Sequence, residues 1–101
     1  MDIVTDGPVL HLSGDVDVRS TWEVRNAVYD HLSVYDDVVV DLAEVDAIDM
    51  TALKVLAVAT RTASLSGRRL TLRDCSAPVL RMLHLTRLIR LCDVERVPVS
   101  A

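Results

Sequence analysis

A threonine and several aspartates mark the place in this sequence where recognition or chemistry is expected. Thr51 follows Asp49 in a short acidic turn, and Asp15 and Asp17 stand in an earlier acidic turn. A hydroxyl close to carboxylates can act as a nucleophile or as a recognition feature, or it can satisfy backbone groups at the start of a helix. Which of these applies depends on the elements that position Thr51 and the aspartates.

The elements around Thr51 are predicted to be a buried strand and the helix that follows it. Val38–Leu42 is β-branched and nearly all apolar, which is typical of a central parallel strand covered on both faces. Apolar residues then recur at helical spacing, which predicts a helix over Met50–Leu65 with Asp49 as its N-cap and Gly67 as its terminator. Thr51 therefore falls in the first turn of a helix that leaves the carboxyl end of a strand, where open α/β sheets place their functional surface.

A second strand and helix precede this unit. Val9–Ser13 reads as a strand, and Ser20 and Glu23 fit a capping box that opens a helix ending near Leu32. Trp22, in the first turn of this helix, is the only tryptophan. Its position suits either a core side chain or a surface anchor for a partner, and the sequence leaves both interpretations open.

The two predicted strands should end at the same edge of one sheet. Strands joined by a crossover helix are parallel and connected right-handedly in nearly all proteins. The acidic residues that follow both strands are thus expected to lie together with the threonine: Asp15, Asp17, Asp46, Asp49 and Thr51. For Asp46 alone we expect a local role as the cap of a turn.

The remaining segments complete an α/β fold. Ile3–Thr5 is predicted as an edge strand, Leu70–Leu72 as a parallel strand and Leu91–Val97 as a last short strand, while Ser76 caps a third helix with Pro78 in its first turn. The expected fold is a mostly parallel sheet of about five strands with an antiparallel N-terminal edge strand, packed with about three helices.

Length and composition indicate one compact domain over residues 1–101. Half of the residues are hydrophobic and 26% are charged, which is typical of a globular core and not of a disordered segment. A net charge of -4 with scattered basic residues argues against a nucleic-acid partner. Lys54 interrupts the longest apolar run and the N-terminus lacks a basic leader, so we expect no membrane insertion and a cytoplasmic location.

The residues that usually carry catalysis are not arranged for it. The histidines lack metal-ligand spacing, and the isolated glycines form no phosphate-binding loop. His11 falls within a strand and His84 follows a helix, so neither is placed as a base for Thr51. Cys75 and Cys92, expected near opposite ends of neighbouring strands, are predicted to be reduced. We expect no enzyme activity, metal or cofactor.

A family resemblance rests on the turn that contains Thr51. The strand, the acidic turn and Asp49-Met50-Thr51-Ala52-Leu53 resemble the signature of STAS domains, a family that includes bacterial anti-sigma-factor antagonists. Ser13–Asp17 and the helix exit Leu83–Leu88, where Arg87 stands at the usual glycine, resemble two further family elements, so that the resemblance covers almost the entire chain. It implies a STAS-like fold in which Thr51 is phosphorylated by a partner kinase that is also the anti-sigma factor, of the histidine-kinase-like ATPase type.

The resemblance also implies a partner-binding edge. Its expected members are Asp15, Asp17, Trp22, Asp49, Met50, Thr51, Ala52 and Lys54. Met50 replaces a small hydroxyl residue of the signature, Ala52 replaces its glycine, and Lys54 stands where many members have a small residue.

Two other roles fit the same resemblance. Some short STAS proteins are subunits of ABC-type lipid transporters, where the edge with the matching threonine docks on the ATPase, and a third reading is a STAS module that binds without phosphorylation. After Val97 the chain has no room for the terminal helix of many members. The apolar surface so uncovered is expected to face solvent, a second copy in a homodimer, or a partner.

Overall fold

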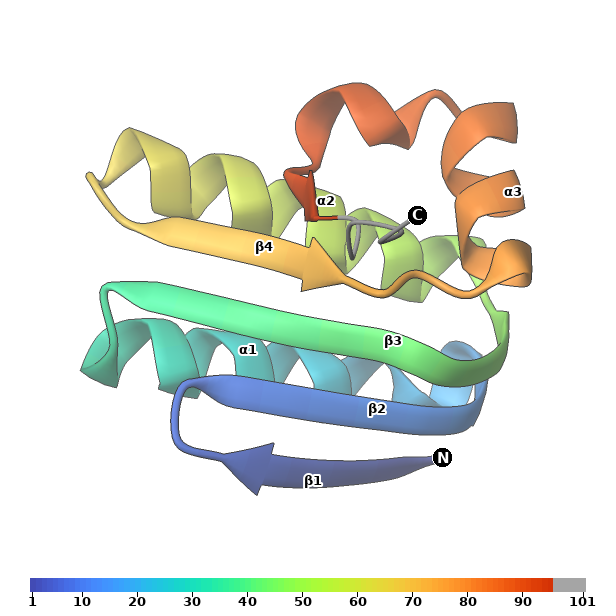
Figure 1. Ribbon diagram of the computed structural model, residues 1–101, viewed down its shortest axis with the longest axis horizontal. Coiled ribbons are helices and arrows are strands. Elements are labelled where there is room, and N and C mark those ends of the chain that lie inside the picture. The colour runs from blue at the N-terminus through green and yellow to red at the C-terminus, as the bar shows by residue number, and fades with distance from the viewer. Residues whose placement is uncertain (96–101) are drawn as a thin grey trace, which may run out of the picture.

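The computed structural model of the protein describes residues 1–95, whose strands form one sheet in the order in which they occur along the chain (Figure 1). The strands are β1 (Asp2–Asp6), β2 (Val9–Val16), β3 (Asp37–Ile48), β4 (Arg69–Arg73) and β5 (Val94–Glu95). β1 is antiparallel to β2, and all other neighbouring strands are parallel. The predicted α/β sheet with an antiparallel edge strand is confirmed.

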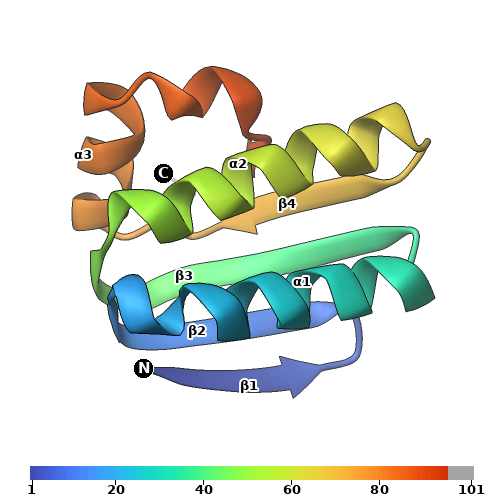
Figure 2. The same cartoon turned by 180° about the vertical axis from the view of Figure 1, so that it is seen from behind.

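Three helices and two short 3₁₀ turns complete the described chain. The helices are α1 (Thr21–Val34), α2 (Met50–Leu65) and α3 (Ala77–Leu85), and the 3₁₀ turns are η1 (Val18–Ser20) and η2 (Leu88–Leu91). Figure 2 shows α1 and α2 side by side against one face of the sheet, with α1 nearer β2 and α2 nearer β4. The predicted bounds of α2 are confirmed, and none of the helices within residues 1–95 has the length and apolar character needed to cross a bilayer.

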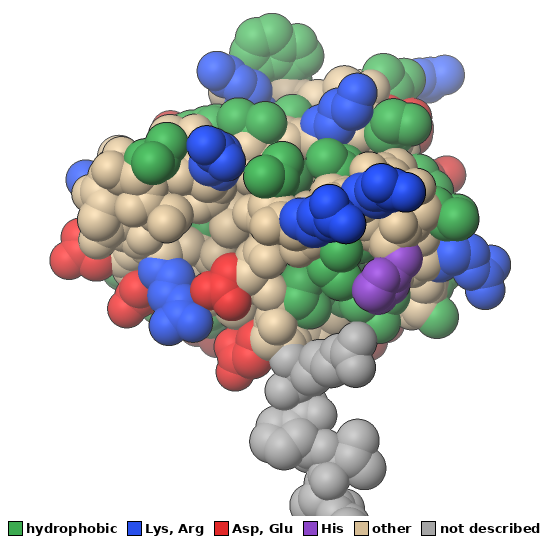
Figure 3. All heavy atoms as spheres, turned by 90° about the horizontal axis from the view of Figure 1, so that it is seen from above, with side chains coloured by type: hydrophobic (Ala, Val, Ile, Leu, Met, Phe, Trp, Pro, Cys, Tyr) green, Lys and Arg blue, Asp and Glu red, His purple; other side chains and the backbone are tan. Residues whose placement is uncertain are grey.

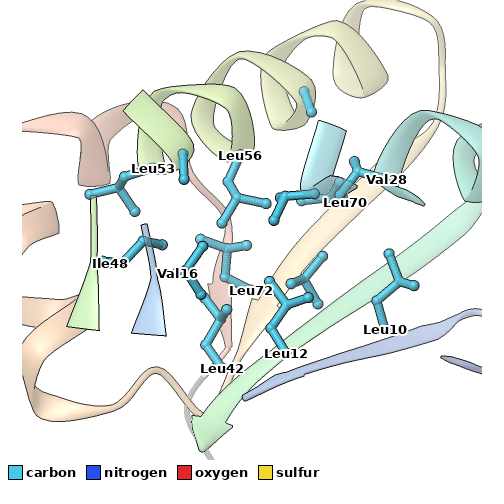
Figure 4. Close-up of a cluster of buried hydrophobic side chains, with 14 of the residues drawn as sticks. Leu10, Leu12, Val16, Val28, Leu42, Ile48, Leu53, Leu56, Leu70 and Leu72 are labelled. Atoms are coloured by element: carbon cyan, nitrogen blue, oxygen red, sulfur yellow. The ribbon is translucent and has the colours of Figure 1, made fainter. Parts of the chain in front are cut away.

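The core lies between the sheet and these two helices (Figure 4). Leu10, Val40 and Leu72 stand in register across β2, β3 and β4 and are fully buried. Leu53 and Leu56 bring the apolar face of α2 against this row. Each fully buried Leu contributes about 1.5–3 kcal/mol relative to exposure, so packing along α2 fixes where its first turn lies.

β3 is longer than predicted because its pairing with β2 is irregular. The prediction stopped at Leu42, but the strand continues to Ile48, and the register with β2 shifts twice along the way. Each shift places an extra residue on β3, so that Leu42, Val45 and Ile48 are buried at a spacing of three. Asp46 accordingly lies within a strand, and the expectation that it caps a turn is wrong.

The predicted capping box at the start of α1 is also wrong. Ser20 has helical backbone angles, and its hydroxyl donates to Asp17 Oδ1 at 3.2 Å. The side-chain cap is instead Asp17, which caps the preceding turn η1, because its Oδ1 also accepts from the N–H groups of Arg19 (3.0 Å) and Ser20 (3.2 Å). Ser76 precedes α3 as predicted, but its hydroxyl donates to the Val45 carbonyl at 2.7 Å and ties α3 to β3.

The sheet face away from α1 and α2 carries a row of polar and charged side chains. His11, Asp41 and Arg73 are register neighbours on β2, β3 and β4. Arg73 Nη2 donates to Asp41 Oδ2 at 2.9 Å, the Ala43 N–H donates to Asp41 Oδ1 at 3.0 Å, and His11 Nδ1 lies 3.5 Å from Asp41 Oδ2. Burial raises the pKa of the Asp41 carboxyl, but these hydrogen bonds and the charge of Arg73 outweigh it, so the pKa is lower than its ordinary value.

The C-terminal part of the fold differs from the prediction at the start of its last strand. Leu91 belongs to η2, and the last strand begins only at Val94, while its predicted end at Val97 and the expected absence of a terminal helix lie outside the described residues. Cys75 follows the end of β4 and Cys92 precedes the start of β5, so they lie near opposite ends of neighbouring parallel strands, as predicted. Both thiols are free.

Candidate functional site

The acidic turns after β2 and β3 meet at one edge of the sheet, as predicted. Val16 pairs with Ile48 at the ends of the two strands, and Asp15 pairs with Ala47. The Asp49 N–H then donates to the Val16 carbonyl at 2.8 Å, which ties the start of α2 to the end of β2. Figure 1 shows that α1 and α2 both begin at this end of the sheet.

Thr51 lies in the first turn of α2 with its side chain exposed. Its backbone N–H donates to Asp49 Oδ2 at 2.8 Å, which confirms the predicted N-cap. The first turn of a helix has backbone N–H groups without helical partners and carries a partial positive charge. An exposed hydroxyl in this position is accessible to a modifying enzyme, and the helix terminus favours an added negative charge.

The carboxylates at this edge have different functions in the fold. Asp17 and Asp49 are occupied as the caps of η1 and α2. Asp15 and Asp46 are exposed, and neither side chain makes a hydrogen bond or ion pair within residues 1–95. Asp15 and Asp46 are therefore the carboxylates that a partner can contact without breaking a cap.

Exposed apolar side chains accompany these polar groups. Trp22 is 68% exposed, which excludes the core interpretation, and the Arg25 guanidinium stands 5.5 Å from its ring centroid. Val18 in η1 is 62% exposed, and Met50 at the start of α2 is 44% exposed. η1 and α1 both contact α2, and α1 begins at the same end of the sheet as α2, so these side chains belong to the same edge as Thr51. We call Val18, Trp22, Met50 and Thr51 the switch edge.

The sequence prediction missed two residues here and misplaced another. Val18 was missed because η1 interrupts the path from β2 to α1. Arg25 follows Trp22 by three residues in α1, a helical spacing that could have indicated the contact with its ring. Ala52 was predicted as a partner contact but is fully buried, since it lies on the sheet-facing side of α2. Lys54 is exposed one turn beyond Thr51, as a partner contact requires.

Histidines are placed elsewhere in the fold. His11 lies beside Asp41 on the sheet, and His31 Nδ1 bonds the Ala27 carbonyl within α1 at 3.1 Å. His84 is in the last turn of α3.

Comparison with known proteins identifies the family. Residues 1–93 match the STAS_2 family model, described as "Mlab, STAS domain", and the chain belongs to this family. A search of the curated proteins found no match.

Solved structures share the fold. SpoIIAA, an anti-sigma factor antagonist in its unphosphorylated form, is 12% identical with a TM-score of 0.76, covering 98% of this chain and 89% of its own. An anti-sigma factor antagonist from Mycobacterium paratuberculosis is 19% identical with a TM-score of 0.76, covering 97% and 84%. TM1081 of Thermotoga maritima, described as a candidate antagonist of the same kind, is 22% identical with a TM-score of 0.75, covering 98% and 87%. At these identities the likeness establishes the STAS fold.

Proposed function

We propose that this STAS domain is an anti-sigma-factor antagonist that binds its partner through the switch edge and is released when Thr51 is phosphorylated. The observation that carries the proposal is the exposed Thr51 side chain in the first turn of α2, beside exposed apolar side chains and two unengaged carboxylates. The partner is an anti-sigma factor of the histidine-kinase-like ATPase type, which also phosphorylates Thr51. The domain itself acts by binding, without catalysis.

Phosphorylation would change the switch edge more than the fold. A phosphate at Thr51 adds about -1.5 to -2 charges. The N-terminus of α2 compensates for part of this, by about 0.3–1 kcal/mol at an exposed position. The added charge lies on the same edge as Asp15 and Asp46 and as the apolar Met50 and Trp22. A partner that covers this edge would have to bury the phosphate without an opposite charge beside it, which weakens binding.

The test is an affinity capture from the native cell extract with four tagged forms of the protein. They are the wild type, Thr51→Glu, Thr51→Ser and Thr62→Glu, which adds the same charge about three turns further along α2. We expect the wild type, Thr51→Ser and Thr62→Glu to capture a kinase-like ATPase, and Thr51→Glu to lose it while its circular dichroism spectrum stays native. Equal capture by Thr51→Glu would contradict the switch.

Phosphorylation itself is tested with the captured ATPase. Incubation with ATP should add the mass of one phosphate to the wild type and to Thr51→Ser, and none to Thr51→Val. A phosphate found at another residue would show that the switch edge is not the modified site.

A second candidate function is that of an accessory subunit docking on the ATPase of an ABC-type lipid transporter. The description of the matched family model, "Mlab, STAS domain", names no anti-sigma-factor antagonist, and this observation favours the second candidate. The same capture experiment separates the two, because an ABC ATPase would replace the kinase-like ATPase. A STAS module that binds without phosphorylation would retain its partner in the Thr51→Glu form.

A further inference from the structure

The charges of this protein are strongly segregated along the chain. Eight of the eleven Lys and Arg residues lie between Met50 and Cys92, and Asp74 is the only acidic residue in that range. Figure 3 views the molecule from above β4, where Lys and Arg side chains are spaced among hydrophobic ones and the visible acidic side chains gather mostly at one corner. A protein with a net charge of -4 therefore has a locally basic region.

Part of this basic region surrounds a cavity of about 560 Å³. The cavity lies between the C-terminal half of α2, the start of β4 and the segment from η2 to β5. Among the residues that line it are four arginines, one serine and one aspartate: Arg61, Arg68, Arg69, Arg90, Ser64 and Asp93. Four guanidinium groups around one cavity repel one another unless carboxylates or a bound anion compensate for them.

Only one of the four arginines is compensated within the described part of the chain. Arg69 Nε donates to Asp93 Oδ2 at 2.9 Å. Arg61, Arg68 and Arg90 have no carboxylate within 4.0 Å among residues 1–95. Three guanidinium groups thus remain available to a ligand.

The last carbonyl groups of α2 do not need the arginine side chains as hydrogen-bond donors. The last carbonyls of the helix are capped by backbone N–H groups, with Ser66 bonding the carbonyl of Thr62 and Arg68 that of Ala63. The Thr60 hydroxyl donates to the Leu56 carbonyl at 2.8 Å, so it is also occupied. Ser64 is exposed, and its hydroxyl is a further hydrogen-bond donor for a ligand, beside the guanidinium groups.

We propose that this cavity binds a phosphate group through Arg61, Arg68, Arg90 and Ser64. Guanidinium donors form a planar fork that matches the oxygens of phosphate, and their charge opposes that of a phosphate mono- or diester. Arg61 lies roughly 15 Å along α2 from Thr51, at a rise of 1.5 Å per residue. The cavity is therefore separate from the switch edge, and its occupation does not depend on the proposed function.

The surroundings of the cavity distinguish two sources of the phosphate. Leu65 is 78% exposed and Leu91 is 37% exposed, and both line the cavity beside the arginines. A phosphate carried on a lipid headgroup would allow both leucines to enter the membrane interface. A phosphate on a small soluble molecule would leave Leu65 in water.

The experiment compares two probes and four proteins. Glycerol 3-phosphate is titrated calorimetrically, and sedimentation is measured with vesicles of phosphatidylcholine alone or mixed with phosphatidylglycerol. The proteins are the wild type, Arg68→Gln/Arg90→Gln, Leu65→Ser and Arg81→Gln. The last is a control for the loss of an exposed arginine of α3 that does not line the cavity.

We expect wild type and Arg81→Gln to bind one of the probes and the double variant to bind it about tenfold or more weakly, because charge-assisted hydrogen bonds are lost. Binding of glycerol 3-phosphate identifies a soluble source. Binding only to phosphatidylglycerol vesicles, weakened by Leu65→Ser, identifies a headgroup. The proposal is overturned if the wild type binds neither probe, or if Arg81→Gln weakens binding as much as the double variant does.

Discussion

Replacement of Asp49 by alanine should lower stability at the switch edge by a predictable amount. The side chain contributes one hydrogen bond, from the Thr51 N–H to Oδ2 at 2.8 Å. Losing such an N-cap costs about 1 kcal/mol, and losing its charge beside the helix N-terminus costs about 0.3–1 kcal/mol more. The backbone bond from Asp49 N–H to the Val16 carbonyl is kept, so the total should be about 1–2 kcal/mol. Asp49→Asn keeps the acceptor oxygen and should cost about 0.5 kcal/mol or less.

Urea unfolding followed by circular dichroism measures both values, and a 1 kcal/mol loss should lower the Tm by about 4–8 °C in a domain of this size. Partner capture is measured in parallel below the unfolding transition. An Asp49→Ala protein as stable as the wild type would refute the capping argument. An Asp49→Asn protein of native stability that no longer binds would assign the carboxylate a direct partner contact.

Three further predictions concern residues outside the switch edge. Because the pKa of Asp41 is lowered in the folded state, its ion pair with Arg73 stabilises the protein above the unfolded pKa, and this is lost as pH falls through the folded pKa. Asp41→Asn should therefore show a shallower loss of the urea midpoint in acid, and parallel curves would contradict this. Arg87 has a φ of 61°, a left-handed conformation that costs a non-glycine residue about 1 kcal/mol. Arg87→Gly should raise the free energy of unfolding by about that amount, and a lower urea midpoint would show that side-chain contacts outweigh strain. Burial raises the pKa values of Cys75 and Cys92 to about 11, so alkylation at pH 8 should be about a hundredfold slower than for free cysteine; rates near those of the free thiol would show that both are accessible.

The sequence was most informative where local signals agree. For α2, the helical spacing, the acceptor side chain of Asp49 and the glycine at 67 all indicate the same boundaries, and Gly67 has a φ of +74°. The convergence of Asp15 and Asp49 also followed from the sequence, because the handedness of crossover connections determines which strand ends meet. These parts of the site follow from local helix signals and from the handedness of the connection, which a few residues are enough to indicate.

The parts that were missed depend on pairings between distant segments. β3 continues past Leu42 because it carries extra residues opposite β2, and a bulge replaces the alternation by which strands are recognised. Ser20 and Glu23 have the spacing of a capping box, yet Asp17 is closer to the turn that forms and takes the role. The burial of Ala52, in contrast, was predictable, because it shares the apolar face of α2 with Leu56.

The order of the strands also bears on synthesis of the protein. Each strand pairs with the one before it, so the sheet can grow in one direction as the chain leaves the ribosome. All four residues of the switch edge, from Val18 to Thr51, precede β4 in the sequence. Ser76 forms its bond to the Val45 carbonyl only later, when α3 is added. The switch edge is therefore made of residues that leave the ribosome before β4 and α3 do.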